Sequence, residues 1–254
     1  MADLAGSLRE RVAVVTGGSR GIGAAVAIGL AEAGAKVLVT SRTEGGCQDV
    51  VATIRGRGGE AAEAVADLAD PESADRVVQA AVERWGGLHA LVNNGGLLKP
   101  HFVQKITTQE LDQLLTVNFL GPFAFCQAAL PHLQADGGSI VNMSALSATR
   151  GQAGMGAYAA SKAAMLAMTR TMAREWGPLG VRVNAVVPGA VATDMILPRD
   201  PEKVPPFLEQ MGAKVALGRI AVPDDLVGPT VFLAGSASAY VTGQCLFVDG
   251  GAFE

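Results

Sequence analysis

The stretch from Val12 to Gly34, VAVVTGGSRGIGAAVAIGLAEAG, decides the fold. An apolar run of strand length leads into a glycine-rich turn, and an alanine-rich segment of helix length follows. Glycine permits a tight turn and a close backbone approach, and the N-terminus of the helix offers free N–H groups and a partial positive charge to a phosphate. The glycine spacing is G-x-x-x-G-x-G rather than G-x-G-x-x-G. The combination predicts a dinucleotide site at the start of a βαβ unit, with a purely structural turn as the alternative.

Short apolar runs alternate with helix-length segments along the rest of the chain. Two helix starts carry boundary signals, Asp70 followed by Pro71 and the capping-box spacing TTQE at 107–110. This alternation predicts an α/β fold, a doubly wound parallel sheet with helices on both faces and its ligand site at the carboxyl ends of the strands. The seven predicted strands are 12–16, 36–40, 63–67, 90–94, 139–143, 181–186 and 245–250.

Composition supports this fold and excludes several functions. A chain of 254 residues suits one large α/β domain, and 49% hydrophobic residues with only 5% aromatics suit a buried parallel sheet. The net charge of -4, without a long run of Lys or Arg, argues against nucleic acid as a partner. The three cysteines lack CxxC spacing and the three histidines form no ligand cluster, so we expect no metal.

The location of the protein is also predicted from composition. Three widely spaced cysteines suggest buried thiols in a reducing compartment. The N-terminal segment is charged, and no apolar run has membrane-spanning length. We therefore expect a cytoplasmic protein without a membrane contact.

The segment 196–206, ILPRDPEKVPP, stands out because it contains four prolines. Proline removes a backbone donor and disfavours a helix interior, so this segment is expected to lack a regular helix. We predict an irregular flap, within a substrate loop at about 190–215.

The end of the second strand predicts the cofactor. Thr40, Ser41 and Arg42 occupy the position where a carboxylate would hold the adenosine ribose. Arg20, from the glycine loop, would lie near the same ribose. Two guanidinium groups suit a 2′-phosphate and favour NADP(H), whereas NAD(H) with Glu44 on the ribose is the alternative.

A tyrosine and a lysine, Tyr158 and Lys162, are spaced four apart in YAASK. On a helix they share one face. A nearby cation favours the phenolate, and an acid/base works best with its pKa near the working pH. The pair therefore predicts a proton donor and acceptor, unless the spacing on a surface helix is accidental.

Six blocks in this order make the chain resemble the short-chain dehydrogenase/reductase family. The resemblance covers nearly the whole chain and implies one seven-stranded Rossmann domain over 1–254, nicotinamide-dependent oxidoreduction of an alcohol or ketone, and usually a homotetramer. The blocks are TGGSRGIG at 16–23, NNGG at 93–96, Asn118 in VNFLGP, YAASK at 158–162, RVNAVVPGAVATDM at 182–195 and VTGQCLFVDGG at 241–251.

The resemblance also implies roles for individual residues. Tyr158 would be the acid/base, Lys162 would bind the nicotinamide ribose and lower the pKa of Tyr158, and Asn118 would lie in a kinked helix that holds a water linked to Lys162. The other expected cofactor residues are Gly17, Ser19, Arg20, Gly21, Ile22 and Gly23 in the glycine loop, Ser41 and Arg42, then Asp67 and Leu68 at adenine, Asn93 and Gly95 at the adenosine ribose, and Pro188, Gly189, Val191 and Thr193 at nicotinamide.

The catalytic serine of the family is missing. It commonly lies thirteen residues before the tyrosine, where this chain has Ala145. Ser144 should point away from the site unless the strand bulges, and Ser147 lies beyond the predicted strand end. Three interpretations stay open: Ser144 or Ser147 substitutes, the enzyme is slow or uses a substrate hydroxyl, or the site is inactive or altered by engineering. Losing one such donor typically costs ~10²–10³ in turnover.

Methionines are candidates for the substrate pocket. Met155 and Met195 flank the catalytic segment and the flap, so we include them in the pocket with Ala145 and Ser147. Met165, Met168 and Met172 recur at helical spacing and are expected to pack in the core or at a subunit contact.

These patterns predict an NADP(H)-dependent carbonyl reductase, or the reverse alcohol oxidation, acting on a small and apolar ketone or alcohol. Reduction of a 3-oxoacyl carrier protein leads among the substrates, followed by a small-molecule or steroid-like ketone. The alternatives are an NAD(H)-dependent alcohol dehydrogenase and a dinucleotide-binding protein that has lost turnover.

Overall fold

The computed structural model describes residues 6–252 and contains one seven-stranded sheet. All strands are parallel, in the order β3-β2-β1-β4-β5-β6-β7, and the chain belongs to the Rossmann-type folds. The predicted sheet is confirmed, with β3 beginning two residues earlier than expected. The strands are β1 (Val12–Val15), β2 (Lys36–Ser41), β3 (Ala61–Val65), β4 (Ala90–Asn93), β5 (Ser139–Met143), β6 (Arg182–Pro188) and β7 (Cys245–Val248).

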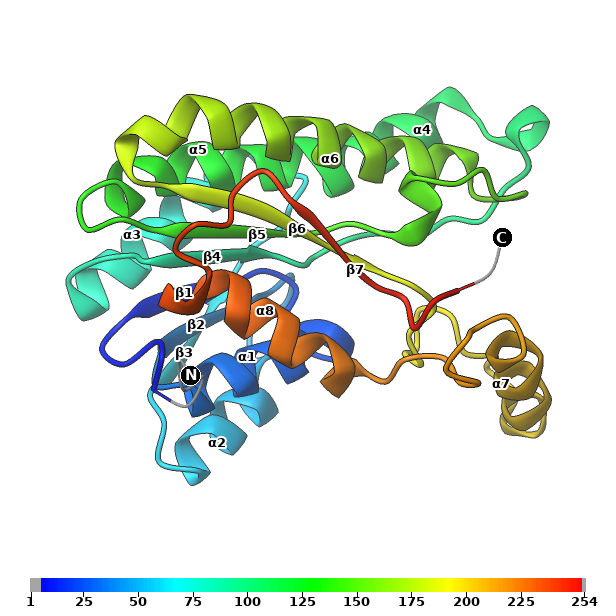
Figure 1. Ribbon diagram of the computed structural model, residues 1–254, viewed down its shortest axis with the longest axis horizontal. Coiled ribbons are helices and arrows are strands. Elements are labelled where there is room, and N and C mark those ends of the chain that lie inside the picture. Colours follow the sequence, from blue (N-terminus) through cyan, green and yellow to red (C-terminus); the bar gives the residue numbers. More distant parts are fainter. Residues whose placement is uncertain (1–5, 253–254) are drawn as a thin grey trace.

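Helices cover both faces of the sheet (Figure 1). α1, α2 and α8 lie on one face and α3, α4, α5 and α6 on the other, whereas α7 projects beyond the sheet. The helices are α1 (Gly21–Glu32), α2 (Gln48–Gly56), α3 (Glu72–Trp85), α4 (Thr108–Leu115), α5 (Gly121–Leu133), α6 (Gly156–Trp176), α7 (Val204–Gly212) and α8 (Val227–Ala234).

The central strand β1 shows why the protein has two core layers. Ala13 and Val15 pack with the helices on the α1 side, whereas Val12 and Val14 pack with those on the α5 side. Successive strand residues point to opposite faces. A continuous apolar run therefore serves both layers, as expected for a parallel sheet buried on both sides.

The strand order also places the ligand site. β1 pairs with β2 on one side and with β4 on the other, so the chain changes winding direction at β1. The loops after β1 and β4 diverge to opposite faces and leave a crevice at the carboxyl ends of these two strands.

Both predicted helix starts have capping bonds. The Glu110 N–H donates to Thr107 Oγ1 at 3.2 Å, and the Thr107 N–H donates to Glu110 Oε2 at 3.0 Å, which completes the capping box. The Glu72 N–H donates to Asp70 Oδ1 at 3.0 Å, although α3 begins one residue after the predicted Pro71.

The prediction for the flap is partly wrong. Residues 196–203 contain only a short 3₁₀ turn, Pro201–Lys203, but the helix α7 begins at Val204. Pro205 and Pro206 lie in its first turn, where the backbone N–H groups have no intrahelical partner and proline is tolerated.

The prediction that no apolar run has membrane-spanning length is also wrong. α4, a π-helical turn (Thr116–Leu120) and α5 form one continuous helix, Thr108–Leu133, with a mean hydropathy of 1.4 in its most apolar window. Phe125 and Leu133 of this helix are buried in the core beside α3. A core helix can have the same length and hydropathy, and 39% of this window is buried.

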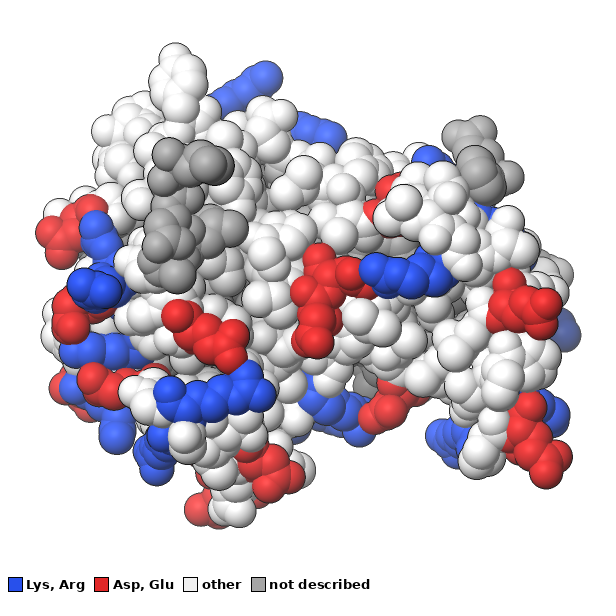
Figure 2. Space-filling view, turned by 60° about the horizontal axis from the view of Figure 1, so that its bottom comes forward, with Lys and Arg blue, Asp and Glu red and all other residues white. Residues whose placement is uncertain are grey.

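Charge is mixed on the surface. On the face shown in Figure 2, basic and acidic side chains lie interspersed, in keeping with the net charge of -4.

Candidate active site at the carboxyl ends of the strands

A cavity of about 590 Å³ opens at the carboxyl ends of the strands. A larger cavity, about 670 Å³, lies at the opposite ends around Arg11, His89 and Arg182, away from the predicted site residues. The first cavity brings together most of the predicted cofactor residues. They are Gly17, Ser19, Arg20, Gly21, Ile22, Ser41, Arg42, Asp67, Leu68, Gly95, Tyr158, Lys162, Pro188 and Thr193.

The glycine loop is pressed against the loop that follows β4. Gly17 has a φ of 63°, and a Cβ there would lie 2.5 Å from the Cα of Gly95. Asn94 Nδ2 donates to the carbonyl oxygens of Thr16 at 3.1 Å and Gly17 at 2.9 Å. These contacts fix a backbone surface that a side chain would obstruct. Sequence reasoning missed Asn94, although it is the second asparagine of NNGG.

Gly23 supports the loop without lining the cavity. A Cβ at Gly23 would lie 2.3 Å from the carbonyl oxygen of Gly17 and 2.4 Å from Nδ2 of Asn94. Glycine therefore lets the first turn of α1 pack directly on the loop.

The two predicted arginines, Arg20 and Arg42, border the same cavity, whereas Glu44 is exposed and outside its lining. This arrangement agrees better with a 2′-phosphate than with a carboxylate on the ribose. Arg20 Nη1 also lies 3.9 Å from Asp194 Oδ2, between two exposed side chains. Such an ion pair is weak and leaves Arg20 available to a ligand.

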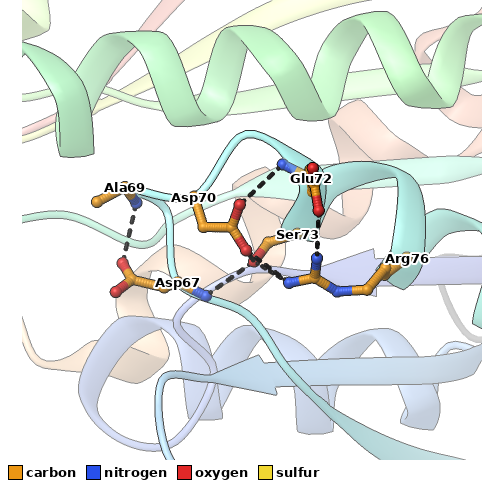
Figure 3. A network of polar contacts seen from close by, with 6 residues as sticks. All are labelled: Asp67, Ala69, Asp70, Glu72, Ser73 and Arg76. Atoms are coloured by element: carbon orange, nitrogen blue, oxygen red, sulfur yellow. Dashed lines mark hydrogen bonds and ion pairs between the residues drawn. The ribbon is translucent and has the colours of Figure 1, made fainter.

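The loop that carries Asp67 and Leu68 is held by polar contacts with the start of α3 (Figure 3). The Asp67 N–H donates to Ser73 Oγ at 3.3 Å, and Ser73 Oγ donates to Asp70 Oδ2 at 3.1 Å. Arg76 Nη2 lies 2.6 Å from the same carboxylate oxygen, and this hydrogen bond keeps the pKa of Asp70 below its usual range. The network fixes one wall of the cavity.

Asn93 does not place its side chain in the cavity, contrary to the prediction. It is 3% exposed, and Nδ2 donates to Asn142 Oδ1 at 2.9 Å and to Cys126 Sγ at 3.2 Å. Because strand side chains alternate, Asn93 points into the α5 and α6 layer and Asn94 borders the cavity instead.

Two residues of the predicted nicotinamide segment also lie outside the lining. A Cβ on Gly189 would lie 3.0 Å from the Cα of Asp249, so this glycine packs against the end of β7. Val191 is 5% exposed and belongs to the core. Through this packing, both residues fix the position of the segment from Pro188 to Thr193 without facing the cavity.

Tyr158 and Lys162 lie on consecutive turns of α6, and both border the cavity. Lys162 is 5% exposed, and its Nζ donates to the Met143 carbonyl oxygen at 2.9 Å. Burial raises the pKa of Tyr158 to about 12 and lowers the pKa of Lys162 to about 8. The predicted lowering of the tyrosine pKa by the lysine is therefore not seen, because desolvation by burial is the cause of both shifts.

Asn118 lies in the π-helical turn and is 1% exposed. Its Oδ1 accepts from the Leu97 N–H at 2.7 Å, and its Nδ2 donates to Ser161 Oγ at 3.0 Å. Ser161 Oγ in turn donates to the Tyr158 carbonyl oxygen at 2.7 Å. The side chain thus links the loop after β4 to the turn of α6 that carries Tyr158, and it does not itself line the cavity.

The structure narrows the search for the missing hydroxyl. Ser144 borders the cavity, but its Oγ donates to the Lys162 carbonyl oxygen at 3.1 Å. A hydroxyl has one proton to donate, so Ser144 is a poor substitute for the catalytic serine. Ala145 has extended backbone (φ -158°, ψ 152°) and lies two residues past the end of β5. Ala145 and the half-buried Ser147 both lie outside the cavity lining.

The two methionines proposed for the pocket differ. Met195 is 51% exposed and borders the cavity, whereas Met155 precedes the first turn of α6 and lies outside the lining. Met165 and Met172 are buried in the core, and Met168 packs against it, as expected for packing residues.

Part of the cavity wall could not be predicted. Gln113 and Val117, from α4 and the π-helical turn, reach the cavity together with Leu97. Gln113 and Leu97 lie outside the motifs, and Val117 lies in VNFLGP without having been singled out, so the tertiary fold is needed to place all three at the site.

The lining suits a dinucleotide. One continuous cavity runs from Arg42 beyond β2 to Pro188 at the end of β6, past a glycine backbone surface at the start of α1. An extended ligand with phosphates in its middle matches this sequence of groups. Within residues 6–252, no group of three or more His, Cys, Asp or Glu is arranged to hold a metal ion.

Comparison with known proteins agrees with this site. A family model described as enoyl-(acyl carrier protein) reductase matches residues 17–252. The short-chain reductase protein NovJ of Streptomyces niveus is 40% identical over 96% of this chain and 94% of its own length. The 3-oxoacyl-[acyl-carrier-protein] reductase FabG of Vibrio cholerae is 36% identical over 97% and 99%, respectively.

A solved structure gives the same result in three dimensions. It is a Beutenbergia cavernae protein, provisionally described as an NAD(P)-dependent gluconate 5-dehydrogenase with bound NADP. It superposes with a TM-score of 0.89 at 38% identity, covering 97% of this chain and 98% of that chain. The chain belongs to the short-chain dehydrogenase/reductase family of oxidoreductases.

Proposed function

We propose that the protein interconverts a ketone and a secondary alcohol by NADP(H)-dependent hydride transfer, with Tyr158 as the acid/base. One observation carries this proposal: Tyr158 and Lys162 border the same cavity as the glycine loop and both arginines. Proton donor, ammonium group and phosphate-binding surface therefore surround one continuous volume.

The cofactor would lie with its pyrophosphate on the loop at Gly17 and its adenosine phosphate near Arg20 and Arg42. When bound, the dinucleotide supplies or accepts the hydride. NADP(H) is favoured because forked guanidinium groups bind phosphate in charge-assisted pairs, and the NADP in the Beutenbergia structure supports the assignment. NAD(H) is the alternative.

In the reductive direction Tyr158 donates a proton to the substrate oxygen. Its raised pKa, about 12, keeps the phenol protonated at neutral pH and so ready to donate. Lys162 would bind the ribose hydroxyls through its ammonium group, and Asn118 and Ser161 hold the turn of α6 that carries Tyr158. Because Ser144 donates to the α6 backbone, Tyr158 has no partner donor there, and we expect slow turnover.

The proposed substrate is a small and apolar carbonyl compound. The exposed Met195 and the half-buried Ile196 and Leu197 form the start of the flap, and they favour apolar contacts. A 3-oxoacyl thioester is the leading class, supported by the relative from Vibrio cholerae. We further propose a cytoplasmic homotetramer, to which the exposed Phe247 on the edge strand β7 would contribute a subunit contact.

The proposal is tested by following NADPH oxidation with a panel of 3-oxoacyl thioesters, cyclic ketones and sugar-derived ketones. We expect turnover with at least one apolar ketone, which tight NADPH binding without oxidation of any of them would contradict.

A second candidate function is a dinucleotide-binding protein that has lost turnover. It is favoured by Ala145 at the serine position and by the inward hydrogen bond of Ser144. Under this alternative, NADPH binds tightly, no ketone is reduced and Ala145→Ser restores no activity. Restored activity would show that the remaining machinery is competent.

A further inference from the structure

The chain after β7 returns toward the flap, which in the structure comprises residues 196–217 and includes α7. Asp249 Oδ1 accepts a hydrogen bond from the Gly251 N–H at 3.0 Å, which tightens the turn. A Cβ on Gly250 would lie 2.8 Å from Val215 Cγ1, and one on Gly251 would lie 2.9 Å from Ala216 Cβ. The two glycines therefore allow the tail, residues 249–252, to lie against the segment that follows α7.

The tail forms a small antiparallel pairing with that segment, 215–217. The Ala216 N–H donates to the Gly251 carbonyl oxygen and the Leu217 N–H to the Gly250 carbonyl oxygen, each at 3.1 Å. Val215 and Ala252 form an antiparallel bridge. In Figure 1 the red end of the chain approaches the orange segment beside α7. The tail is thus bound to the base of the flap.

The tail also contacts the loop between β5 and α6, the catalytic connection, which leads to Tyr158. Arg150, in the loop between β5 and α6, donates from Nη1 to the Ala252 carbonyl oxygen at 2.8 Å. The side chain is half-buried, and a hydrogen bond from a charged donor is stronger than one between neutral groups. One arginine therefore ties the tail to the loop that precedes Tyr158.

The flap itself is weakly packed. Gly212 is the one buried residue of α7, so this helix contributes little apolar packing to its own position. A segment with few buried contacts opens at low free-energy cost. Contacts at its base then weigh more in deciding where it lies.

We propose that Arg150 is a positioning residue that acts through Ala252 to hold the base of the flap against the catalytic connection. Its effect on the reaction rests on the function proposed above. The tether fixes the position of the flap without touching the reacting atoms, so it sets KM for the ketone rather than the rate of the chemical step.

The tether is tested without substrate or cofactor by hydrogen exchange with mass spectrometry. In Arg150→Ala, amides of the peptide spanning 213–217 should exchange about tenfold faster, the scale of one lost charged hydrogen bond. Arg150→Lys keeps a charged donor and should recover part of this protection. The matched control, Arg174→Ala, removes an exposed arginine from the last turn of α6 and should leave exchange at 213–217 unchanged. Unchanged exchange in Arg150→Ala, with an unchanged melting temperature, would overturn the tether.

Kinetics separate this inference from the proposed function. Arg150→Ala should raise KM for the ketone about tenfold, with kcat within twofold and unchanged NADPH affinity, and Arg150→Lys should recover part of the loss. Faster exchange with an unchanged KM would overturn the positioning role, although turnover remains. Faster exchange in a protein that reduces no ketone would overturn the proposed function and support the tether alone.

Discussion

The two walls of the cavity are built differently. The dinucleotide wall, at the ends of β1, β2 and β4, is mainly backbone held by glycines and by Asn94. The catalytic wall, at the end of β5 and the start of α6, depends on the direction of a few side chains. There Ser144 turns its hydroxyl to the α6 backbone and Ala145 offers none. The first wall keeps its glycine backbone and both arginines at the cavity, although Asn93 turns away from it, whereas the second lacks one donor.

The sharpest test of the catalytic wall removes its remaining hydroxyl. Tyr158→Phe should lower kcat/KM by about 10²–10⁴, the range for a general acid, because no second side chain is placed to donate the proton. NADPH affinity measured by calorimetry should stay within about threefold, since the dinucleotide wall is unchanged. Residual turnover above about 1% of the parent would remove Tyr158 from the acid/base role.

The same difference explains which parts were predictable from the sequence. Seven apolar runs and the glycine spacing require only local rules, so the sheet and the glycine loop were predicted closely. Asn93 and Asn94 were confused because the residue at which a strand ends decides which one faces the cavity.

Other features depend on tertiary contacts. Gln113 and Val117 reach the site only because a π-helical turn joins α4 to α5. The pKa of Tyr158 was predicted with the wrong sign because burial depends on the packing around it. A four-residue spacing places the lysine nearby but says nothing about the desolvation of either group.

A second test restores the missing donor. Ala145→Ser places a hydroxyl on extended backbone at the position where the family has its serine. We expect kcat to rise by about 10–10², somewhat below the 10²–10³ typical of losing such a donor, because Ala145 lies outside the cavity lining and a hydroxyl there would reach the site only in part. Initial rates of NADPH oxidation measure the effect.

Two controls accompany that test. Ser144→Ala should leave kcat within about threefold and lower the free energy of unfolding by about 1 kcal/mol, the usual value of a hydrogen bond. Ser147→Ala should also leave kcat unchanged, since Ser147 lies outside the cavity lining. A large loss of kcat in either variant would identify that serine as the substitute donor.

The dinucleotide wall is tested through the charge at its far end. NADPH should bind at least tenfold more tightly than NADH, and the double variant Arg20→Ala with Arg42→Ala should abolish this difference by weakening NADPH alone. Calorimetry with both nucleotides measures it. Equal affinities in the parent protein would assign the ribose to another residue.

The smallest expected effect concerns the stability of the free protein. Burial lowers the pKa of Lys162 from 10.5 to about 8, so the folded protein binds fewer protons than the unfolded chain between these values. Stability therefore rises with pH in this window, and it is lowest below pH 8, where the buried ammonium is charged in the folded state. From pH 7 to 9.5 the gain attributable to Lys162 should be about 2 kcal/mol.

Urea unfolding of the parent and of Lys162→Met at several pH values isolates this contribution. The variant keeps the unbranched apolar stem but cannot titrate. The unfolding free energy of the parent minus that of the variant should therefore increase by about 2 kcal/mol as the pH rises from 7 to 9.5. Above about pH 10 the stability of both proteins should fall, because the pKa of Tyr158 is about 12 when folded and 10.0 when unfolded, and this contribution cancels from the difference between them. A constant difference across pH 7–9.5 would mean that Lys162 is not desolvated, and the catalytic wall would then be more open to water than the structure places it.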